Sequence, residues 1–251
     1  MKKIKKINAA IIIIGNEILS GRTQDVNVVN ISNWLNALGV KLEEVRIIPD
    51  VEKTIIKTVR ETRKKFTYIF TTGGIGPTHD DITAKSIAKA FKVKYNYHPE
   101  AYKILKNYYE KGKFNVGRKK MAKMAKNASL IFNPSSAAPG FYIKNVYCLP
   151  GVPSILKSML GGLNNKIVGG KKIISNSINL RTIESEISSP LEKVQNKYKN
   201  NVEIGSYPFF KQGRLGVSLV IRSDKLKLIE KCKKEIMFFV NKKKIKIIKN
   251  K

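Results

Sequence analysis

The fold is decided by one stretch of the sequence, Tyr68-Ile-Phe-Thr-Thr-Gly-Gly-Ile-Gly-Pro-Thr-His-Asp-Asp-Ile-Thr83. Its first five residues are β-branched or aromatic, which is typical of a buried strand, and the residues after it have apolar side chains at helical spacing. Between them, Gly73, Gly74 and Gly76 lack a Cβ, so the backbone can take positive φ and present N–H groups to an anion. The following helix would add N–H donors and partial positive charge. We therefore predict a phosphate site here.

Two acidic residues, Asp80 and Asp81, follow the glycines and would repel a bare phosphate. A divalent cation such as Mg²⁺, held by one or two carboxylates plus substrate phosphates, resolves that conflict. The alternative is that one or both of them cap the helix and offset its dipole. The loop has neither common phosphate signature, because His79 stands where a dinucleotide fingerprint needs Gly or Ala, and no Gly-Lys-Ser/Thr follows.

Composition indicates a globular protein, with 251 residues of which 42% are hydrophobic. No run approaches 18 apolar residues, and we interpret Ala9–Ile14, after a Lys-rich start, as a first strand rather than a signal peptide. We therefore expect a cytoplasmic protein without membrane association. Cys148 and Cys232 lie far apart without partner histidines, which argues against a disulfide framework or a zinc site.

The formal net charge is +31, which raises a nucleic-acid function as an alternative. The basic residues are mostly Lys spread along the whole chain, whereas Arg, which reads bases and clamps phosphates, is scarce. Nucleic-acid binding is therefore the weaker interpretation. We expect the positive surface to attract phosphorylated small molecules instead.

The first third of the chain reads strand, helix, strand, helix, strand, with strands at residues 9–14, 40–48 and 68–72. This order predicts an α/β fold, a doubly wound, mostly parallel sheet with helices on both faces. If the first strand lies between the second and third, residues 15–17 and 73–81 face one crevice at the carboxyl ends of the strands. Asp50 would lie one strand away and lean into it, or would cap the helix that follows.

Two more loops rich in Gly, Pro and Ser follow strands in the middle of the chain. A helix opened by Pro99 and a basic segment at residues 112–126 lead to a strand at 129–132 and the loop 133–140. A hairpin at 141–149 then ends in the turn 150–153 and a helix at 154–160. We expect these loops to close over the ligand through Ser135, Pro139, Gly140, Pro150 and Gly151, unless they are ordinary turns.

Glycine pairs at residues 161–162 and 169–170 mark the best domain boundary. We predict one domain at residues 1–168 and a small α+β (KH-like) domain at 169–251. Its expected strands are 172–180, 202–207 and 215–221, and its second helix is 225–240. Gly213-Arg-Leu-Gly216 matches the GXXG of KH domains, but it leads into a strand, so we interpret it as a turn. The Lys-rich segment 242–251 is expected to be a frayed or solvated tail.

Several motifs together resemble the MoaB/Mog molybdopterin-binding domain, in the variant found in the amino-terminal part of CinA and in eukaryotic FAD synthase. They are Gly15-Asn-Glu-Ile-Leu-Ser-Gly21, Asp25-Val-Asn27, residues 71–83, Ala138-Pro-Gly-Phe141 and Leu149-Pro-Gly-Val-Pro153. Ile204-Gly-Ser-Tyr-Pro208 resembles the small domain that follows in this family. The carboxyl-terminal deamidase domain of full-length CinA has no counterpart here.

The resemblance implies a molybdopterin-like or nucleotide-diphosphate ligand and, for the CinA branch, metal-dependent cleavage of ADP-ribose-type pyrophosphates. In Mog relatives, the residues that match Asp81 and Asp50 serve metal-assisted adenylyl transfer to molybdopterin. Relatives commonly form dimers or trimers, so a homo-oligomer is expected. Two positions depart from the family pattern: Ser136, near which the family has Gly, and Ile155, where it has an acidic residue. The missing carboxylate would weaken metal binding.

The sequence therefore predicts a Mg²⁺-dependent hydrolase of nucleotide pyrophosphates, with a non-catalytic molybdopterin or nucleotide binder and an adenylyl transferase as alternatives. Asp80, Asp81 and Asp50 are the expected ligands of Mg²⁺ or another divalent cation. Glu17 is either a base or a loop hydrogen-bonding group. The other expected ligand-binding residues are Thr72, Gly73, Gly74, Gly76, Pro77, Thr78, Asp25, Asn27, Ser135, Pro139, Gly140, Pro150 and Gly151.

Overall fold

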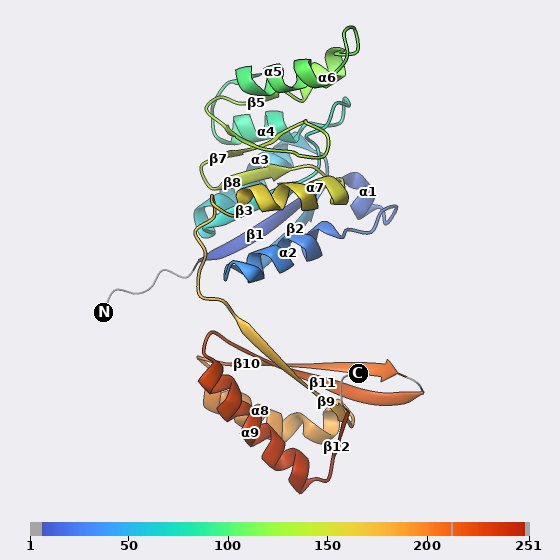
Figure 1. Cartoon of the computed structure of the whole chain (residues 1–251), viewed down its shortest axis with the longest axis vertical. Helices are drawn as coiled ribbons and strands as arrows, with labels where there is room; N and C mark the ends of the chain where they lie inside the picture. The colour runs from blue at the N-terminus through green and yellow to red at the C-terminus, as the bar shows by residue number, and fades with distance from the viewer. Residues whose placement is uncertain (1–6, 212, 249–251) are drawn as a thin grey trace, which may run out of the picture. The chain divides into compact units, whose positions relative to one another are not determined.

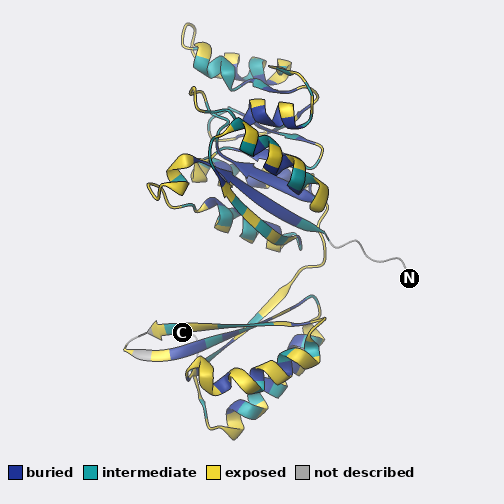
Figure 2. Cartoon of the chain, turned by 180° about the vertical axis from the view of Figure 1, so that it is seen from behind, coloured by how far each residue is buried: buried dark blue, intermediate teal, exposed yellow. Residues whose placement is uncertain are grey.

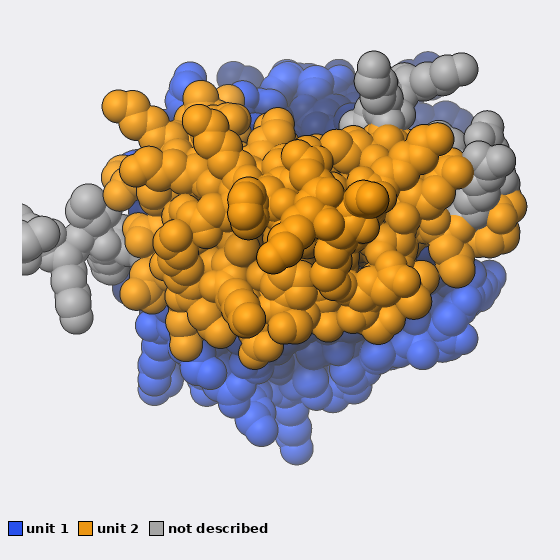
Figure 3. Space-filling model, turned by 90° about the horizontal axis from the view of Figure 1, so that it is seen from below, with its two compact units in different colours: residues 1–170 blue, residues 171–251 orange. Residues whose placement is uncertain are grey.

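The computed structural model describes residues 7–211 and 213–248. The chain forms two compact units, Met1–Gly170 and Lys171–Lys251, which are coloured separately in Figure 3. The division falls two residues after residue 168, where the sequence analysis ended the first domain. No helix within the described residues is long and apolar enough to cross a membrane.

A six-stranded sheet organises the first unit, with the strand order β2-β1-β3-β8-β7-β6 (Figure 1). Four strands are parallel: β2 (Lys41–Ile48), β1 (Asn8–Ile14), β3 (Tyr68–Thr72) and β8 (Val146–Leu149). Next to them, β7 (Gly140–Ile143) pairs antiparallel with β8, and the edge strand β6 (Ser129–Ile131) pairs antiparallel with β7. The first strand lies between the second and the third, as predicted, so the winding reverses between β1 and β3. The predicted doubly wound, mostly parallel α/β fold is confirmed.

Both faces of this sheet are covered, which explains the uninterrupted apolar run in β1 (Figure 2). Side chains of a strand alternate between faces. Ala10, Ile12 and Ile14 enter the core that includes α3 (Glu52–Lys65) and α4 (Thr83–Ala90). The alternate residues, such as Ile11, enter the core shared with α2 (Asn27–Ala37) and α7 (Pro153–Leu160). The short helices α1 (Asn16–Leu19) and η1 (Gly161–Leu163) follow β1 and α7.

Phe70, in the middle of β3, anchors the second of these cores. Its ring is stacked on Tyr147 of β8 at a centroid distance of 5.2 Å, and Trp34 of α2 meets it edge-on at 5.6 Å. The indole Nε1 of Trp34 donates to Oδ1 of Asn164, 2.8 Å away. These contacts tie α2 and the segment after η1 to the strand that leads into the glycine turn.

Between α4 and β6 the chain makes an excursion of small elements. It contains β4 (Tyr95–Tyr97), α5 (Pro99–Tyr108), α6 (Val116–Lys120) and β5 (Lys123–Ala125), and β4 pairs with β5. Tyr102, Tyr109 and Phe114 pack as a small aromatic cluster beneath α6. This cluster holds α6 against α5 and places the basic segment predicted at residues 112–126.

The second unit is an antiparallel sheet of four strands, in the order β10-β11-β9-β12, with two helices packed on it. Its elements are β9 (Ile174–Arg181), α8 (Glu184–Tyr198), β10 (Glu203–Lys211), β11 (Arg214–Ser223), α9 (Leu226–Lys242) and β12 (Lys246–Ile248). Gly213 lies in the turn between β10 and β11 with a φ of 70°. The GXXG match is therefore a hairpin turn that runs into a strand and does not join two helices.

One expectation about this unit was wrong. The Lys-rich segment 242–251 was expected to be a solvated tail, but Lys246–Ile248 form β12, which pairs with β9 through Arg181, Leu180 and Asn179. The lysines around its isoleucines mask the apolar pattern that would indicate a strand. Pairing with the long strand β9 stabilises β12 despite the positive charge of these lysines. The end of this segment, residues 249–251, lies outside the described residues.

Candidate functional site

The carboxyl ends of β1, β2, β3 and β8 surround a cavity of about 530 Å³. The loop after β6 and the turn before α7 complete its wall. The lining residues are Ile14, Glu17, Thr23, Asp50, Gly73, Gly74, Ile75, Gly76, Pro77, Asp80, Asp81, Met121, Asn133, Ser136, Ala138, Pro139, Pro150, Gly151, Val152 and Ile155. This is the crevice predicted at the point where the winding reverses.

The glycine turn after β3 could not be made with larger residues. Gly73 and Gly74 have φ values of 96° and 67°. A Cβ on Gly73 would lie 2.2 Å from the carbonyl oxygen of Ile14, and one on Gly74 would lie 2.2 Å from Oγ1 of Thr83. The N–H of Gly73 donates to the carbonyl of Leu149 at 3.1 Å, so this group is used within the fold. Gly73 therefore lines the cavity, and its missing Cβ lets the end of β3 pass close to the end of β1.

Asp50 lines the cavity and joins the loops after β1 and β2. Its Oδ2 accepts a hydrogen bond from the N–H of Asn16 at 2.9 Å. Helix α3 begins two residues later without a side-chain cap, so the structure does not support the capping alternative for Asp50. Burial, followed by the charges of Glu17, Asp80 and Asp81, raises the pKa of Asp50, against the effect of the Asn16 hydrogen bond. Four carboxylates therefore repel one another around this cavity.

Asp81 is held by its own loop. Its Oδ2 accepts from the N–H of Thr78 at 2.8 Å and from the Thr78 hydroxyl. A Cβ on Gly76 would lie 2.7 Å from the same oxygen, which explains the glycine at that position. Helix α4 has no side-chain cap, so neither Asp80 nor Asp81 caps it.

The neighbouring carboxylate, Asp80, is exposed and differs from Asp50 in its electrostatics. The nearby Thr78 hydroxyl lowers the pKa of Asp80, although its hydrogen bond goes to Asp81, and so do the backbone N–H of Asp80 and the charges of His79 and Lys120. The Asp80 side chain is therefore stabilised in its ionised form. It is available as a ligand for a cation in the cavity.

The three predicted metal ligands share the cavity but do not converge on one point. Within the described residues, no group of three or more His, Cys, Asp or Glu side chains could hold a metal ion by itself. The donor set still suits Mg²⁺, which is usually held by one or two carboxylates and completes its shell with substrate phosphates and water. Burial is the main cause of the raised pKa of Asp50, and the negative charges of Glu17, Asp80 and Asp81 that add to it also favour a bound cation.

Three of the predicted ligand-binding residues act within the fold around the cavity. Asp25 accepts a hydrogen bond from the N–H of Val28 at the start of α2, at 2.9 Å. Asn27 is buried, and its Nδ2 donates to the carbonyl of Gly151 at 2.8 Å, which fixes the turn before α7. Thr72 is buried at the end of β3.

The remaining residues outside the cavity wall are Thr78, Ser135 and Gly140. Both donors of Thr78 are directed to Asp81, as described above. The Ser135 hydroxyl donates to the Ser158 hydroxyl of α7 at 2.8 Å. Gly140 is buried in β7, where a Cβ would lie 2.6 Å from the carbonyl of Cys148. These residues shape the loops, and their neighbours Ser136 and Pro139 line the cavity.

Sequence reasoning missed Asn133, which organises the second loop from a buried position. Its Oδ1 accepts from the N–H groups of Ser135 and Ser136, and its Nδ2 donates to the carbonyl of Ala138 at 2.8 Å. Asn followed by Pro-Ser-Ser is a pattern for a side chain that bonds its own backbone two residues on, and could have revealed it. Other missed residues make an apolar part of the wall, Met121, Ala138 and Val152, and Ile155, which the sequence singled out for its missing carboxylate, lies with them.

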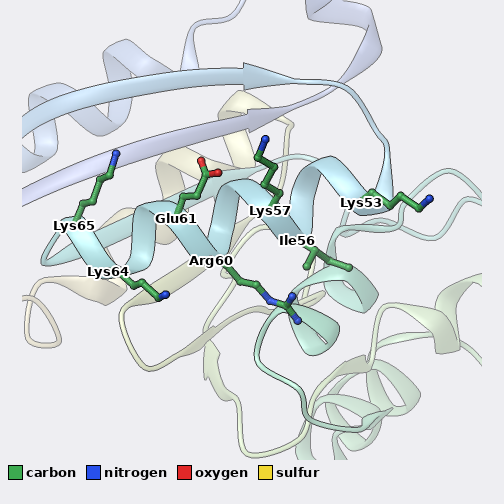
Figure 4. A pocket seen from close by; sticks show the side chains of 7 residues that line it. All are labelled: Lys53, Ile56, Lys57, Arg60, Glu61, Lys64 and Lys65. Carbon is green, nitrogen blue, oxygen red and sulfur yellow. The ribbon is translucent and has the colours of Figure 1, made fainter.

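A second hollow is an open groove of about 580 Å³ along α3 (Figure 4). It is lined by Lys53, Ile56, Lys57, Arg60, Glu61, Lys64 and Lys65. The arginine of this lining is engaged in the fold, because Arg60 donates to the carbonyls of Ala90 and Lys89 at the end of α4. The groove has no glycine turn and no pair of carboxylates, so we place the chemistry in the first cavity.

Comparison with known proteins agrees with this geometry. Residues 10–168 match the family model described as probable molybdopterin binding domain, and residues 172–248 match that of the FAD synthase middle domain. A protein of Archaeoglobus fulgidus is 32% identical over 198 residues, which covers 79% of this chain and 84% of that protein. One of Caldivirga maquilingensis is 33% identical, covering 80% and 82% of the two chains.

A solved structure gives the same assignment. The crystal structure of the protein CinA with unknown function from Thermoplasma acidophilum is 31% identical and has a TM-score of 0.60. The match covers 63% of this chain and 96% of that one. The fold and the cavity thus define an α/β protein with a ligand site at the carboxyl ends of a doubly wound sheet. The chain belongs to the MoaB/Mog-like molybdopterin-binding domain family, in the form found at the amino terminus of CinA.

Proposed function

We propose that this protein is a divalent-metal-dependent hydrolase of nucleotide pyrophosphates such as ADP-ribose. One observation carries the proposal: Glu17, Asp50, Asp80 and Asp81 line the same cavity as the positive-φ turn at Gly73 and Gly74. A pyrophosphate needs both a backbone that admits its oxygens and a cation that offsets its charge. Carboxylates without that cation would exclude such a ligand.

The roles follow from where each side chain lies. Asp80 and Asp81, with Asp50 across the cavity, would hold Mg²⁺ together with phosphate oxygens. The ion would offset charge that develops on the bridging oxygen and lower the pKa of a bound water. Glu17 is exposed on the α1 side of the cavity and is the candidate base that takes a proton from the attacking water. Hydrolysis of ADP-ribose consumes one water and releases AMP and ribose 5-phosphate.

The apolar part of the wall would receive the rest of the ligand. Met121, Ala138, Pro139, Val152 and Ile155 present no charge. A flat heteroaromatic ring buries apolar surface in such a pocket, while the phosphates remain with the glycine turn and the carboxylates. Adenine and pterin are both flat heteroaromatic rings. The apolar wall therefore supports a ligand with such a ring but does not discriminate between the two.

The proposal is tested by incubating the purified protein with ADP-ribose or FAD and Mg²⁺ and measuring AMP by chromatography. We expect release of AMP that stops when the metal is chelated and falls on the order of a hundredfold in Asp81→Asn. Asp224→Asn is the matched control, because Asp224 lies in the second unit and pairs with Lys171. Unchanged cleavage in Asp81→Asn would remove Asp81 from the metal site.

A second candidate, a binder of molybdopterin or a nucleotide without turnover, is favoured by one observation. Within the described residues no three ligands preassemble a metal site, and Ile155 lines the wall where the family resemblance implies an acid. Calorimetric binding of ADP-ribose or molybdopterin without AMP release would support this candidate. Adenylyl transfer, the third, predicts ATP-dependent modification of molybdopterin in the same assay format.

A further inference from the structure

The loop that carries Asp80 and Asp81 is fixed from outside the cavity. Thr78 donates two hydrogen bonds to Oδ2 of Asp81, one from its N–H and one from its hydroxyl. The carbonyl of Thr78 accepts a hydrogen bond from Nζ of Lys120, in α6. Neither Thr78 nor Lys120 belongs to the cavity wall. The two residues therefore act on a ligand only through the carboxylates.

Helix α6, from which Lys120 reaches the loop, is itself fixed by hydrogen bonds and by contacts with aromatic rings. Oδ1 of Asn115 accepts from the N–H of Arg118 at 3.0 Å, which fixes the start of the helix. Arg118 donates to the carbonyl of Lys113, and its guanidinium lies over the ring of Tyr109 at 4.1 Å. The ammonium of Lys119 lies 5.8 Å from the centroid of Phe114. Thus Lys119 faces the aromatic cluster, whereas Lys120 reaches the loop.

A second contact joins α6 to the same loop. A Cβ on Gly117 would lie 3.1 Å from the carbonyl oxygen of Pro77, so the helix backbone passes directly beside the loop. The segment Pro77–Thr78 thus lies between α6 on one side and the carboxylates on the other. Both contacts are to backbone carbonyls of the loop. They therefore fix the position of the loop backbone and do not depend on the loop side chains.

We propose that Lys120 is a positioning residue that sets the metal-binding geometry of Asp80 and Asp81 through Thr78. The inference rests on the proposed function only in naming Mg²⁺ as the ion. The series of contacts is short. Lys120 donates to the Thr78 carbonyl, Thr78 donates to Asp81, and Asp80 lies between Thr78 and Asp81 in the sequence. Groups that orient metal ligands from outside typically contribute tenfold to a hundredfold in metal affinity or activity.

Positioning and simple charge make opposite predictions, which gives a sharp test. Lys120 is a cation near Asp80, and its charge alone opposes binding of another cation. If charge were its only influence, Lys120→Met would strengthen Mg²⁺ binding. If it positions the loop, the same substitution weakens binding, because the carboxylates lose their fixed spacing. Lys119→Met removes one positive charge from the same helix without touching the loop, so it is the matched control for charge and for substitution in α6.

The experiment uses the full chain and follows Mn²⁺ binding by electron paramagnetic resonance, together with the Mg²⁺ dependence of AMP release. We expect Lys120→Met to weaken Mn²⁺ binding at least about tenfold, Lys119→Met to leave it unchanged or slightly tighter, and Lys120→Arg to recover part of the loss. Thermal unfolding of each variant shows whether the fold is kept, and Gly117→Ala, which presses on Pro77 without changing charge, gives a second perturbation of the same contact.

Two results would overturn the inference: tighter or unchanged Mn²⁺ binding in Lys120→Met, or an equal loss in Lys119→Met. Failure of the proposed function is a separate outcome. A wild-type protein that binds Mn²⁺ but releases no AMP would contradict hydrolysis, while the comparison of Mn²⁺ affinities would still decide the role of Lys120.

Discussion

Oδ2 of Asp50 lies 2.9 Å from the backbone nitrogen of Asn16, and this hydrogen bond joins the ends of two neighbouring parallel strands. The bond requires only an acceptor oxygen at position 50. The negative charge of Asp50 is not needed for this hydrogen bond, and burial, followed by the surrounding carboxylates, raises the pKa of Asp50. A substitution at position 50 can therefore separate the structural contribution of the acceptor oxygen from the functional contribution of the negative charge.

Asp50→Asn should keep the protein stable and reduce its activity. The asparagine Oδ1 can still accept from Asn16, and the charge that the folded state disfavours is gone. We expect the free energy of unfolding at pH 7, measured by urea denaturation, to stay equal or rise. We expect metal-dependent AMP release to fall on the order of a hundredfold. A loss of stability with normal cleavage would show that the charge serves the fold.

Gly73→Ala should damage the first unit far more than Gly21→Ala. Both glycines have positive φ, so both substitutions carry the backbone cost of about 1–2 kcal/mol. Only at Gly73 would the new Cβ meet a backbone atom, the Ile14 carbonyl, whereas nothing lies within 4 Å at Gly21. We expect a loss above about 3 kcal/mol at Gly73, read from denaturant unfolding. Equal losses at the two positions would contradict this account of the turn.

The two cysteines should be inert in the folded protein. Both thiols are buried, and burial raises the pKa of Cys148 to about 12 and that of Cys232 to about 11. Because the thiolate is the reactive form, neither should react with a disulfide reagent at pH 8. Cys148 lies in the first unit and Cys232 in the second, so their reactivity in rising urea reports each unit separately. Rapid labelling of the native protein would contradict the buried placement.

Stability should decline at alkaline pH. In β8, burial raises the pKa of Tyr147 and of Cys148 to about 12, above the ordinary values of 10 and 9. A raised pKa means that the folded state holds its proton more tightly, so this contribution is complete below about pH 9 and is lost as the pH rises toward 12. Unfolding titrations of wild type and Tyr147→Phe should differ above pH 10, where the variant has a shallower decline. Parallel curves would contradict the shift at Tyr147.

Much of the first unit could be predicted because its buried strands have a simple apolar pattern in the sequence. The run Ala9–Ile14 is apolar at every position since both faces of β1 are buried, as is typical of a strand in a covered parallel sheet. The glycines of the turn and the acidic pair are adjacent in sequence, so their meeting at one cavity required only the strand order.

The rest depended on contacts that sequence spacing does not encode. Thr78 was expected to face the ligand, but its donors turn to Asp81, because a loop of this length can satisfy a carboxylate internally. Lys120 follows the acidic pair by about forty residues and reaches the loop only because the excursion folds back on it. β12 was missed because the three residues Lys246–Ile248 are too few to give a periodic pattern; the strand forms by pairing with β9.

The edge-on contact of Trp34 with Phe70 also gives the molecule a built-in optical reporter. Trp34 is the only tryptophan in the chain, and it rests on the strand whose last residue precedes Gly73. Its fluorescence emission therefore reports the unfolding of the first unit. It does not report the second unit, whose aromatic residues are Tyr and Phe. Two melting curves, one from indole emission and one from circular dichroism, should separate wherever the units unfold independently.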